Sequence, residues 1–399
     1  MIRLFFKSLW NNKRRNILVF IELFMISFVL VNLTLYLVNM LSIIHIKNCY
    51  DTHNVILVDI TKKNPESEKI AEVSFQNLKK VFASNSFVES VSINTNAVPY
   101  NYNISTTGFN HDSVEIGFAN REVDIDYARV MKIVPLKGRW FDETDRGKAV
   151  HPIIISTEAN EKYFNGNAVG ERIYEKVRSN KITFEIIGVV ERFKRSDIET
   201  PYPVAFILKD SIKAGSTWQT SFLIRTKENK TSDMLAIAES QVYSTLNPES
   251  WTINSLNSLD NMRLQQNNEN YQRNYLTVII ALFVLVNIFL GTIGILWYNT
   301  NLRIHEIGIK RALGSTGKGI KRLLISENLV IAGAGLLMVL IIVLQVPILV
   351  SRGGPPEPGV LLHSIIISVV SMIVLVFLST WIPATIASKI RPATALKTE

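Results

Sequence analysis

Four long apolar stretches separate segments in which hydrophobic and polar positions are mixed. They cover residues 17–41, 275–298, 323–350 and 361–388. Their only formal charges are Glu22 and Glu327. A helix of about 20 apolar residues is long enough to cross the hydrocarbon core of a bilayer. We therefore expect four transmembrane helices, and the pattern excludes a plain soluble enzyme.

A further helix is predicted before the first span. Apolar side chains recur there at helical spacing, at Ile2, Phe5, Phe6, Leu9 and Trp10. Arg3 and Lys7 fall on the other side of such a helix. A basic amphipathic helix of this kind lies in the membrane interface. We expect residues 1–16 to form it on the cytoplasmic side.

Residues 42–274 have an ordinary soluble composition and are numerous enough for a domain with its own core. Two βαβ-like units bracket this block. Strand, helix and strand are expected at residues 54–60, 65–84 and 87–93, and again at residues 220–226, 232–244 and 251–253. Two such units commonly form an α+β sandwich around a mixed sheet. The chain is therefore expected to be an α-helical membrane protein with a large α+β extracytoplasmic domain.

The middle of this block, about residues 95–213, is richer in short strands. They are expected at residues 114–119, 152–156, 183–190 and 203–208. Glycine and proline punctuate them, and we interpret the region as a β-rich subdomain inserted into the βαβ-containing one. Residues 255–274 are polar and lack both glycine and proline, with Leu256, Leu259 and Met262 at helical spacing. They predict a stalk helix that continues into the second span.

The placement of charge orients the spans. Basic residues outnumber acidic ones in residues 1–16, 299–322 and 389–399, whereas residues 42–274 are nearly balanced in a chain of net charge +9. Basic loops stay on the cytoplasmic side of a membrane. Both termini and residues 299–322 are thus expected inside, and residues 42–274 and the loop 351–360 outside. The basic excess is a topology signal, and nucleic acid is not an expected partner.

The sequence offers little for catalysis. It has no HExxH, CxxC or GxSxG pattern, and we expect no catalytic residue, no cofactor and no metal site. Residues 314–319 read GSTGKG and look like a phosphate-binding loop, which needs a glycine five residues before its Gly-Lys pair and Ser or Thr after it. Those positions hold Ala312 and Gly319. The glycines instead predict a turn between two helices.

The segment after the second span carries the most specific motif. Residues 303–315 read RIHEIGIKRALGS, which resembles the R-x-x-E-I-G-I-[KR]-[KR]-A-[LI]-G-[AS] signature of the FtsX-like permeases of ABC transporters, the group that includes MacB. Four weaker motifs of the family are matched in order, at residues 136–141 (LKGRWF), 163–170 (YFNG and VG), 184–190 (FEIIGVV) and 391–397 (RPATALK). The resemblance covers nearly the whole chain.

This resemblance implies a half-transporter of the bacterial inner membrane. The chain would dimerise with a second permease protomer, identical or different, and recruit a separate ABC ATPase subunit. A periplasmic adaptor or another periplasmic protein is implied as a further partner. Members of the family use ATP-driven motion to do work outside the membrane.

Residues 299–322 are the expected docking element for that ATPase. The candidate coupling residues are Arg303, Glu306, Ile307, Gly308, Lys310, Arg311, Leu313 and Gly314. Two simpler interpretations stay open. The basic side chains also suit contact with lipid phosphates. Glu306 lies three residues after Arg303 and four before Lys310, at spacings that suit pairing within one helix.

Three classes of function follow. The size of the outer block and the resemblance favour export of peptides or of hydrophobic or antimicrobial substrates. The same architecture serves the extraction of lipoproteins or the activation of a cell-wall hydrolase. The third class is a receptor that binds a ligand outside and signals inward. It would call for a cytoplasmic signalling domain, and the inner segments found here are short.

Overall fold

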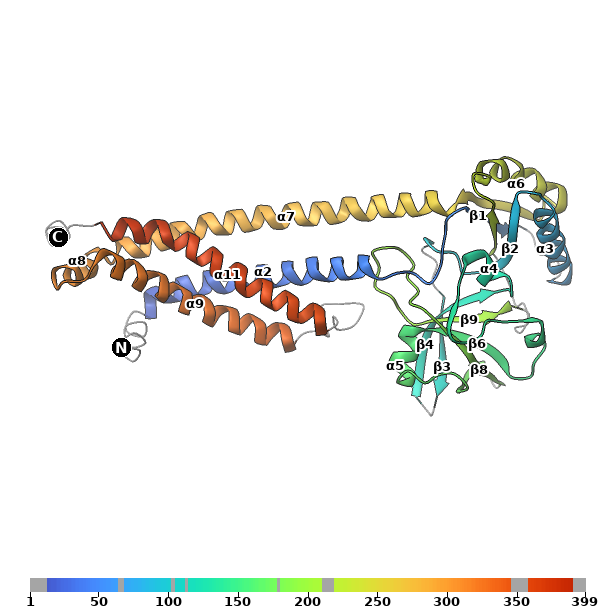
Figure 1. Cartoon of the computed structure of the whole chain (residues 1–399), viewed down its shortest axis with the longest axis horizontal. Coiled ribbons are helices and arrows are strands. Elements are labelled where there is room, and N and C mark those ends of the chain that lie inside the picture. The colour runs from blue at the N-terminus through green and yellow to red at the C-terminus, as the bar shows by residue number, and fades with distance from the viewer. Residues whose placement is uncertain are drawn as a thin grey trace. The chain divides into compact units, whose positions relative to one another are not determined.

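The computed structural model describes residues 13–63, 68–101, 105–111, 114–177, 180–209, 219–345 and 358–389. The chain divides into two compact units (Figure 1). One unit contains Met1–Ser42 and Gln272–Glu399, and the other contains Ile43–Tyr271. The first is built from helices, and the second from a large sheet with helices packed on it.

Within the described residues, four helices are long and apolar enough to cross a membrane, as expected. They are α2 (Lys13–His45), α7 (Leu259–Asn301), α9 (Gly317–Gln345) and α11 (Pro358–Ala387). The start of α11 places Pro358, Gly359 and Val360 in a helix, where the outer loop was expected. Residues 1–12 of the predicted amphipathic helix lie outside the described residues. The rest of the outer loop and residues 390–399 of the tail lie outside them too.

The helices of the first unit share an apolar core. It includes Leu23 and Ile26 of α2, Leu336 of α9 and Val376 of α11. A Cβ on Gly335 would lie only 3.2 Å from the Cα of Phe24. The absence of a side chain at this position therefore lets α9 approach the backbone of α2 closely.

Four strands of the second unit come from two split βαβ units, and the strands of the two units alternate in the sheet. Their order is β11 (Trp251–Ser258), β1 (Val55–Lys62), β10 (Gln219–Thr226) and β2 (Val88–Thr95), and neighbouring strands are antiparallel. Each βαβ unit, β1–α3–β2 and β10–α6–β11, leaves a gap that one strand of the other unit fills. The helices α3 (Glu68–Ala83) and α6 (Thr231–Thr245) bury Phe75, Leu78 and Met234 against one face of these strands.

Most of the strands inserted between β2 and β10 close into a ring. They are β3 (Thr106–His111), β4 (Val114–Val123), β6 (His151–Ser156), β7 (Arg172–Val177), β8 (Asn180–Val190) and β9 (Val204–Leu208). Their pairing runs β4–β3–β7–β8–β6–β9 and returns to β4, so these strands form a barrel. Alternate side chains such as Phe109, Phe118, Phe184 and Ile186 fill one apolar core.

The ring and the four-stranded part belong to one sheet. They join where β2 pairs with β4 through Asn94 and Thr95. The mixed sheet expected around the two βαβ units is not found there, because the four-stranded part is antiparallel throughout. The parallel pairs β4–β9 and β6–β8 lie in the ring, so the sheet as a whole is mixed. A second core packs against the remaining face and includes Phe193, Phe206 and Leu223.

Several elements differ from the expectation. Residues 255–258 belong to β11 and pair with β1, so the predicted stalk helix begins only at Leu259. Leu256 accordingly packs on the core under α3 and α6, whereas Leu259 joins the second core. The sequence interpretation also missed β3, β7, β5 (Pro135–Gly138), α4 (Tyr127–Met131) and α5 (Thr157–Phe164).

Candidate functional site

A short helix follows the second predicted span. The long helix α7 ends at Asn301, and α8 (Ile304–Ala312) begins three residues later. Gly314 then adopts φ +94°, and the Gly314 and Ser315 amides donate to the carbonyls of Arg311 and Lys310. This is a Schellman ending, which favours glycine at the left-handed position. The predicted turn is therefore confirmed at Gly314, but Gly317 and Gly319 already lie in α9.

An ion-pair network fastens α8 to α9. Arg303 donates to both carboxylate oxygens of Glu327, with 3.2 Å between Nη2 and Oε1. The Nε atom of Arg303 also donates to Glu306 at 3.2 Å, and Lys310 donates to the other Glu306 oxygen at 2.8 Å. Arg303 is 9% exposed and Glu327 is 4% exposed. Bidentate pairing of this kind fixes position as well as charge.

The charges of this network support one another. Burial disfavours the charged form of Glu306, but hydrogen bonds from Lys310 and Arg303 outweigh it and lower the pKa of Glu306 to about 2. Burial also disfavours charge on Arg303, yet its hydrogen bonds and attraction to Glu327 and Glu306 raise its pKa. The pairing of Glu306 within its helix, one of the open interpretations, is thus present.

Apolar contacts hold the same face of α8. Ile307 is buried with Ile320, Leu324, Ala384 and Ala387, which come from α9 and α11. Gly308 is buried beside it. Arg311 donates to the carbonyl of Ser388 at the end of α11. The inward face of α8 therefore touches both neighbouring helices.

The outward face of α8 is different. Leu313 is 82% exposed and Ile309 is 43% exposed, and the two lie four residues apart. Leu302, just before the helix, is also exposed. The predicted coupling residues therefore separate into three groups. Arg303, Glu306, Ile307, Gly308 and Arg311 hold the helix in place. Gly314 forms the turn after it, and Lys310 and Leu313 reach the surface. Ile309 and Glu327 were not selected from the sequence, although the lone charge in its span singles out Glu327.

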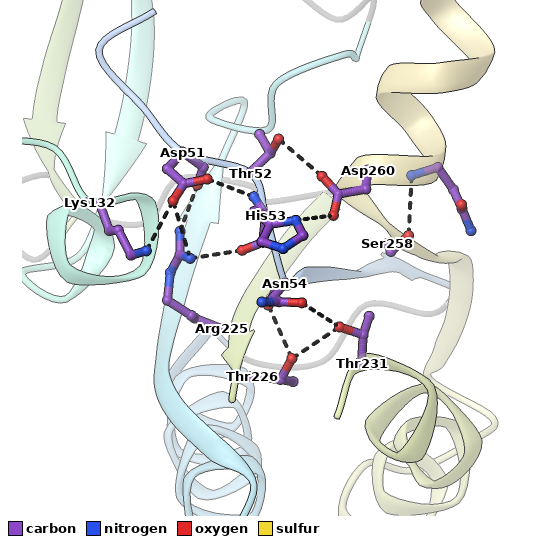
Figure 2. Close-up of polar contacts among 11 residues, drawn as sticks. Asp51, Thr52, His53, Asn54, Lys132, Arg225, Thr226, Thr231, Ser258 and Asp260 are labelled. Atoms are coloured by element: carbon purple, nitrogen blue, oxygen red, sulfur yellow. Dashed lines mark hydrogen bonds and ion pairs between the residues drawn. The ribbon is translucent and has the colours of Figure 1, made fainter. Parts of the chain in front are cut away.

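A second junction lies at the start of β1, in the other unit. Arg225 of β10 is 3% exposed and donates to three backbone carbonyls, those of Val130, His53 and Asp51, at 2.5, 2.8 and 2.6 Å. Figure 2 shows the contacts of Arg225 with His53 and Asp51. Two of these carbonyls belong to the segment that enters the domain after α2. Arg225 therefore fastens this entry segment, residues 46–54, to the sheet.

The same segment meets the first turn of α7. Asp260 accepts from Thr52 at 3.5 Å and lies 3.2 Å from Nδ1 of His53 (Figure 2). The chain segments that lead to and from the helical unit are thus joined to each other and to β10. Among the described residues, no group of three or more His, Cys, Asp or Glu side chains could hold a metal ion.

Known proteins resemble the chain along most of its length. The family described as the MacB-like periplasmic core domain matches residues 26–239, and the FtsX-like permease C-terminal family matches residues 278–392. An uncharacterized ABC transporter permease of Bacillus subtilis (strain 168), YvrN, is 22% identical over 296 residues, a match that covers 69% of each chain.

Solved extracytoplasmic regions resemble part of the chain. One is the periplasmic region of MacB from Actinobacillus actinomycetemcomitans, at 15% identity and a TM-score of 0.38, covering 55% of this chain and 94% of that one. Another is the extracellular domain of the noncanonic ABC-type transporter YknZ from Gram-positive bacteria, at 15% identity and a TM-score of 0.35. It covers 50% of this chain and 100% of that one.

Proposed function

The chain belongs to the FtsX-like ABC transporter permeases with a MacB-like periplasmic core domain, and from this premise we propose that α8 couples a separate ATPase to work done by the outer domain. Permeases of this family work with an ATPase partner and as dimers. The finer proposal is that nucleotide-driven movement of the ATPase displaces α8, and that α7 carries the displacement to the Ile43–Tyr271 unit.

The observation that carries the proposal is the two-sided character of α8. Its inward face is fixed by Arg303, Glu327 and Ile307, whereas Ile309 and Leu313 present apolar surface outward. An apolar patch of adjacent exposed side chains on a fixed helix suits a protein contact. Because the helix is fastened to α9 and α11, a push on that patch would move the helices that hold it.

The continuity of α7 supports transmission. It is a single helix of 43 residues, about 65 Å long at the usual rise per residue. It begins directly after β11 of the sheet and ends three residues before the start of α8. A continuous helix passes on displacement, whereas a flexible linker of the same length would dissipate it.

The rest of the proposal concerns place and substrate. We place the protein in the bacterial inner membrane, with both termini and α8 cytoplasmic and the Ile43–Tyr271 unit periplasmic, because basic residues concentrate in the inner segments. The proposed work is export of peptides or of hydrophobic or antimicrobial substrates from the outer face. The partners are an ABC ATPase, a second permease protomer, which is either identical or different, and a periplasmic protein.

The test is loss of the ATPase from the full-length permease. Ile309→Glu combined with Leu313→Glu places charge on the proposed contact without touching the inward face. We expect the ATPase activity that co-purifies with the tagged chain to fall to near background. Leu136→Glu is the matched control, because Leu136 is an exposed leucine of β5 in the other unit. Unchanged ATPase activity in the double variant would exclude this face as the docking site.

A further inference from the structure

One loop contacts both segments that connect the Ile43–Tyr271 unit to the helices. Residues 191–203 link β8 to β9, and we call them the β8–β9 loop. Two of its charged residues, Lys194 and Asp197, lie three positions apart. Lys194 reaches the end of α2, and Asp197 reaches the first turns of α7.

Lys194 is a buried cation bound to backbone carbonyls. It is 2% exposed, and its Nζ donates to the carbonyl of Ile43 at 3.1 Å and to that of Asp197 at 2.9 Å. Ile43 lies in the last turn of α2, where carbonyls lack helical partners and attract cations. Burial lowers the pKa of Lys194. The side chain therefore caps α2 and ties it to the loop.

Asp197 binds the polar side of α7. Its Oδ2 accepts from Nε of Arg263 at 2.7 Å and from Nδ2 of Asn267 at 2.8 Å, two α7 residues four positions apart. Its Oδ1 accepts from Tyr100 at 3.1 Å. These contacts outweigh the effect of burial and lower the pKa of Asp197. The carboxylate therefore holds one face of the helix start.

The loop itself is firmly seated. Phe193 is fully buried in the second core of the unit. Tyr50 donates to the carbonyl of Lys194 at 2.6 Å, and the amide of Tyr100 donates to the carbonyl of Arg195 at 2.9 Å. The loop continues directly into β9, which pairs with both β4 and β6 and thereby closes the ring. Displacement of the loop would reach the barrel through this strand.

We propose that the β8–β9 loop is a clasp in which Lys194 and Asp197 fasten the end of α2 and the start of α7 to the barrel, so that movement of either helix is delivered to β9. Both are positioning residues, and the inference rests on the function proposed above. Without the clasp, α7 would still enter the sheet through β11, but the direct link from both helices to β9 would be lost.

Hydrogen exchange on the full-length permease with its co-purified ATPase tests the clasp. Exchange is compared with and without vanadate-trapped nucleotide in two peptides, one covering α8 and one covering β9. We expect both peptides to respond in the unaltered protein. Asp197→Ala should abolish most of the β9 response while the α8 response and ATP turnover persist.

Two further variants exclude a merely local defect. Asp197→Arg with Arg263→Asp restores an ion pair with reversed charges and should recover the β9 response. Glu185→Ala removes a surface pair with Arg172 on the same barrel and should leave the response unchanged.

If Asp197→Ala fails to fold, a reversible cross-link tests the clasp instead. Asp197→Cys and Asn267→Cys are combined in a Cys49→Ala background, because Cys49 is the single native cysteine. A short reducible thiol cross-linker closes the clasp in this one protein. We expect the β9 response with the cross-link closed and its loss after reduction.

The outcomes separate the two proposals. A β9 response that is equal in the open and closed states, or that survives Asp197→Ala, overturns the clasp alone. An α8 peptide that does not respond in the unaltered protein overturns the proposed function and the clasp with it.

Discussion

The two junctions use buried cations in different ways. At α8, Arg303 pairs with the carboxylates of Glu327 and Glu306. At the start of β1, Arg225 donates to three backbone carbonyls. A carboxylate partner depends on its side chain, whereas a carbonyl is present at every residue. The first junction can therefore be broken by mutation on either side, and the second chiefly by mutation of the cation.

The largest expected effect concerns the sides of the membrane on which the two regions lie. A membrane-impermeant thiol reagent should label a cysteine introduced at Asn229, an exposed residue of the Ile43–Tyr271 unit, in cells with a permeabilised outer layer. It should miss a cysteine introduced at Ser315, just after α8. The Cys49→Ala background removes the native thiol. Labelling at Ser315 alone would reverse the orientation and remove α8 from reach of a cytoplasmic ATPase.

The next prediction concerns the junction at α8, where Arg303 pairs with carboxylates. Arg303→Met leaves Glu327 buried without its main partner, which should cost about 3–5 kcal/mol of stability. Adding Glu327→Leu removes the remaining charge and should restore most of the loss, because apolar replacement of a buried pair is often close to neutral. Thermal unfolding of the purified permease in detergent measures both. Equal destabilisation by the single and double variants would show that the pair itself is not what the fold needs.

The junction at the start of β1 should lose stability when Arg225 is changed, but little when the side chain of a residue that supplies an acceptor carbonyl is changed. Arg225→Met leaves three backbone carbonyls without this donor, of which that of Val130 is buried, and should cost about 1–3 kcal/mol. Asp51→Asn keeps its backbone carbonyl and should cost less than about 1 kcal/mol, because its ion pairs with Lys132 and Arg225 are partly exposed or long. Unfolding of the two variants under the same conditions gives the comparison. Similar losses in both would contradict the asymmetry.

The smallest effect is a response of α8 to acid. Hydrogen bonds lower the pKa of Glu306 from 4.5 to about 2, so its charge stabilises the fold above pH 4.5. That contribution is lost as the pH falls from 4.5 to about 2. The side chain is 36% exposed, so the effect should stay below about 1 kcal/mol.

Hydrogen exchange of the α8 peptide measures this response. Glu306→Gln should exchange faster than the unaltered protein above pH 4.5, and the difference should disappear near pH 2. A difference that persists unchanged at low pH would mean that the charge of Glu306 is not its cause.

The same contrast explains what the sequence could reveal. Long apolar runs predict spans because few other structures need them, and the lone charge of Glu327 within such a run draws attention to itself. The ring strands with continuous apolar character, such as residues 152–156, were also predicted. Strands β3 and β7 were missed because they contain polar residues, TTGFNH and RIYEKV, that tertiary pairing places in the barrel.

The cations of the outer unit gave no such signal. Arginine and lysine are usual surface residue types, so nothing in the sequence marks Arg225 and Lys194 as buried. Their hydrogen-bond acceptors include backbone carbonyls distant in the sequence, as for Lys194 and Ile43. No residue type marks such an acceptor. The sequence predicts a helix at residues 255–258, because their polar character hides the pairing with β1. In each case a contact across the fold overrides the local pattern.

We propose above that α7 carries displacement from α8 to the outer domain. Leu264, Gln265, Asn268 and Glu269 are exposed on α7, and changing all four leaves Arg263 and Asn267 in place. Glycine at these positions weakens the helix by about 1 kcal/mol per residue relative to alanine, so the quadruple alanine variant is a matched control for the quadruple glycine variant.

The most direct measurement records ATP turnover together with the nucleotide-dependent hydrogen exchange of β9 in both variants of the full complex. The account predicts that the alanine variant behaves like the unaltered protein. It also predicts that the glycine variant hydrolyses ATP at a similar rate but loses the β9 response. A glycine variant that keeps both turnover and the β9 response would contradict transmission through α7.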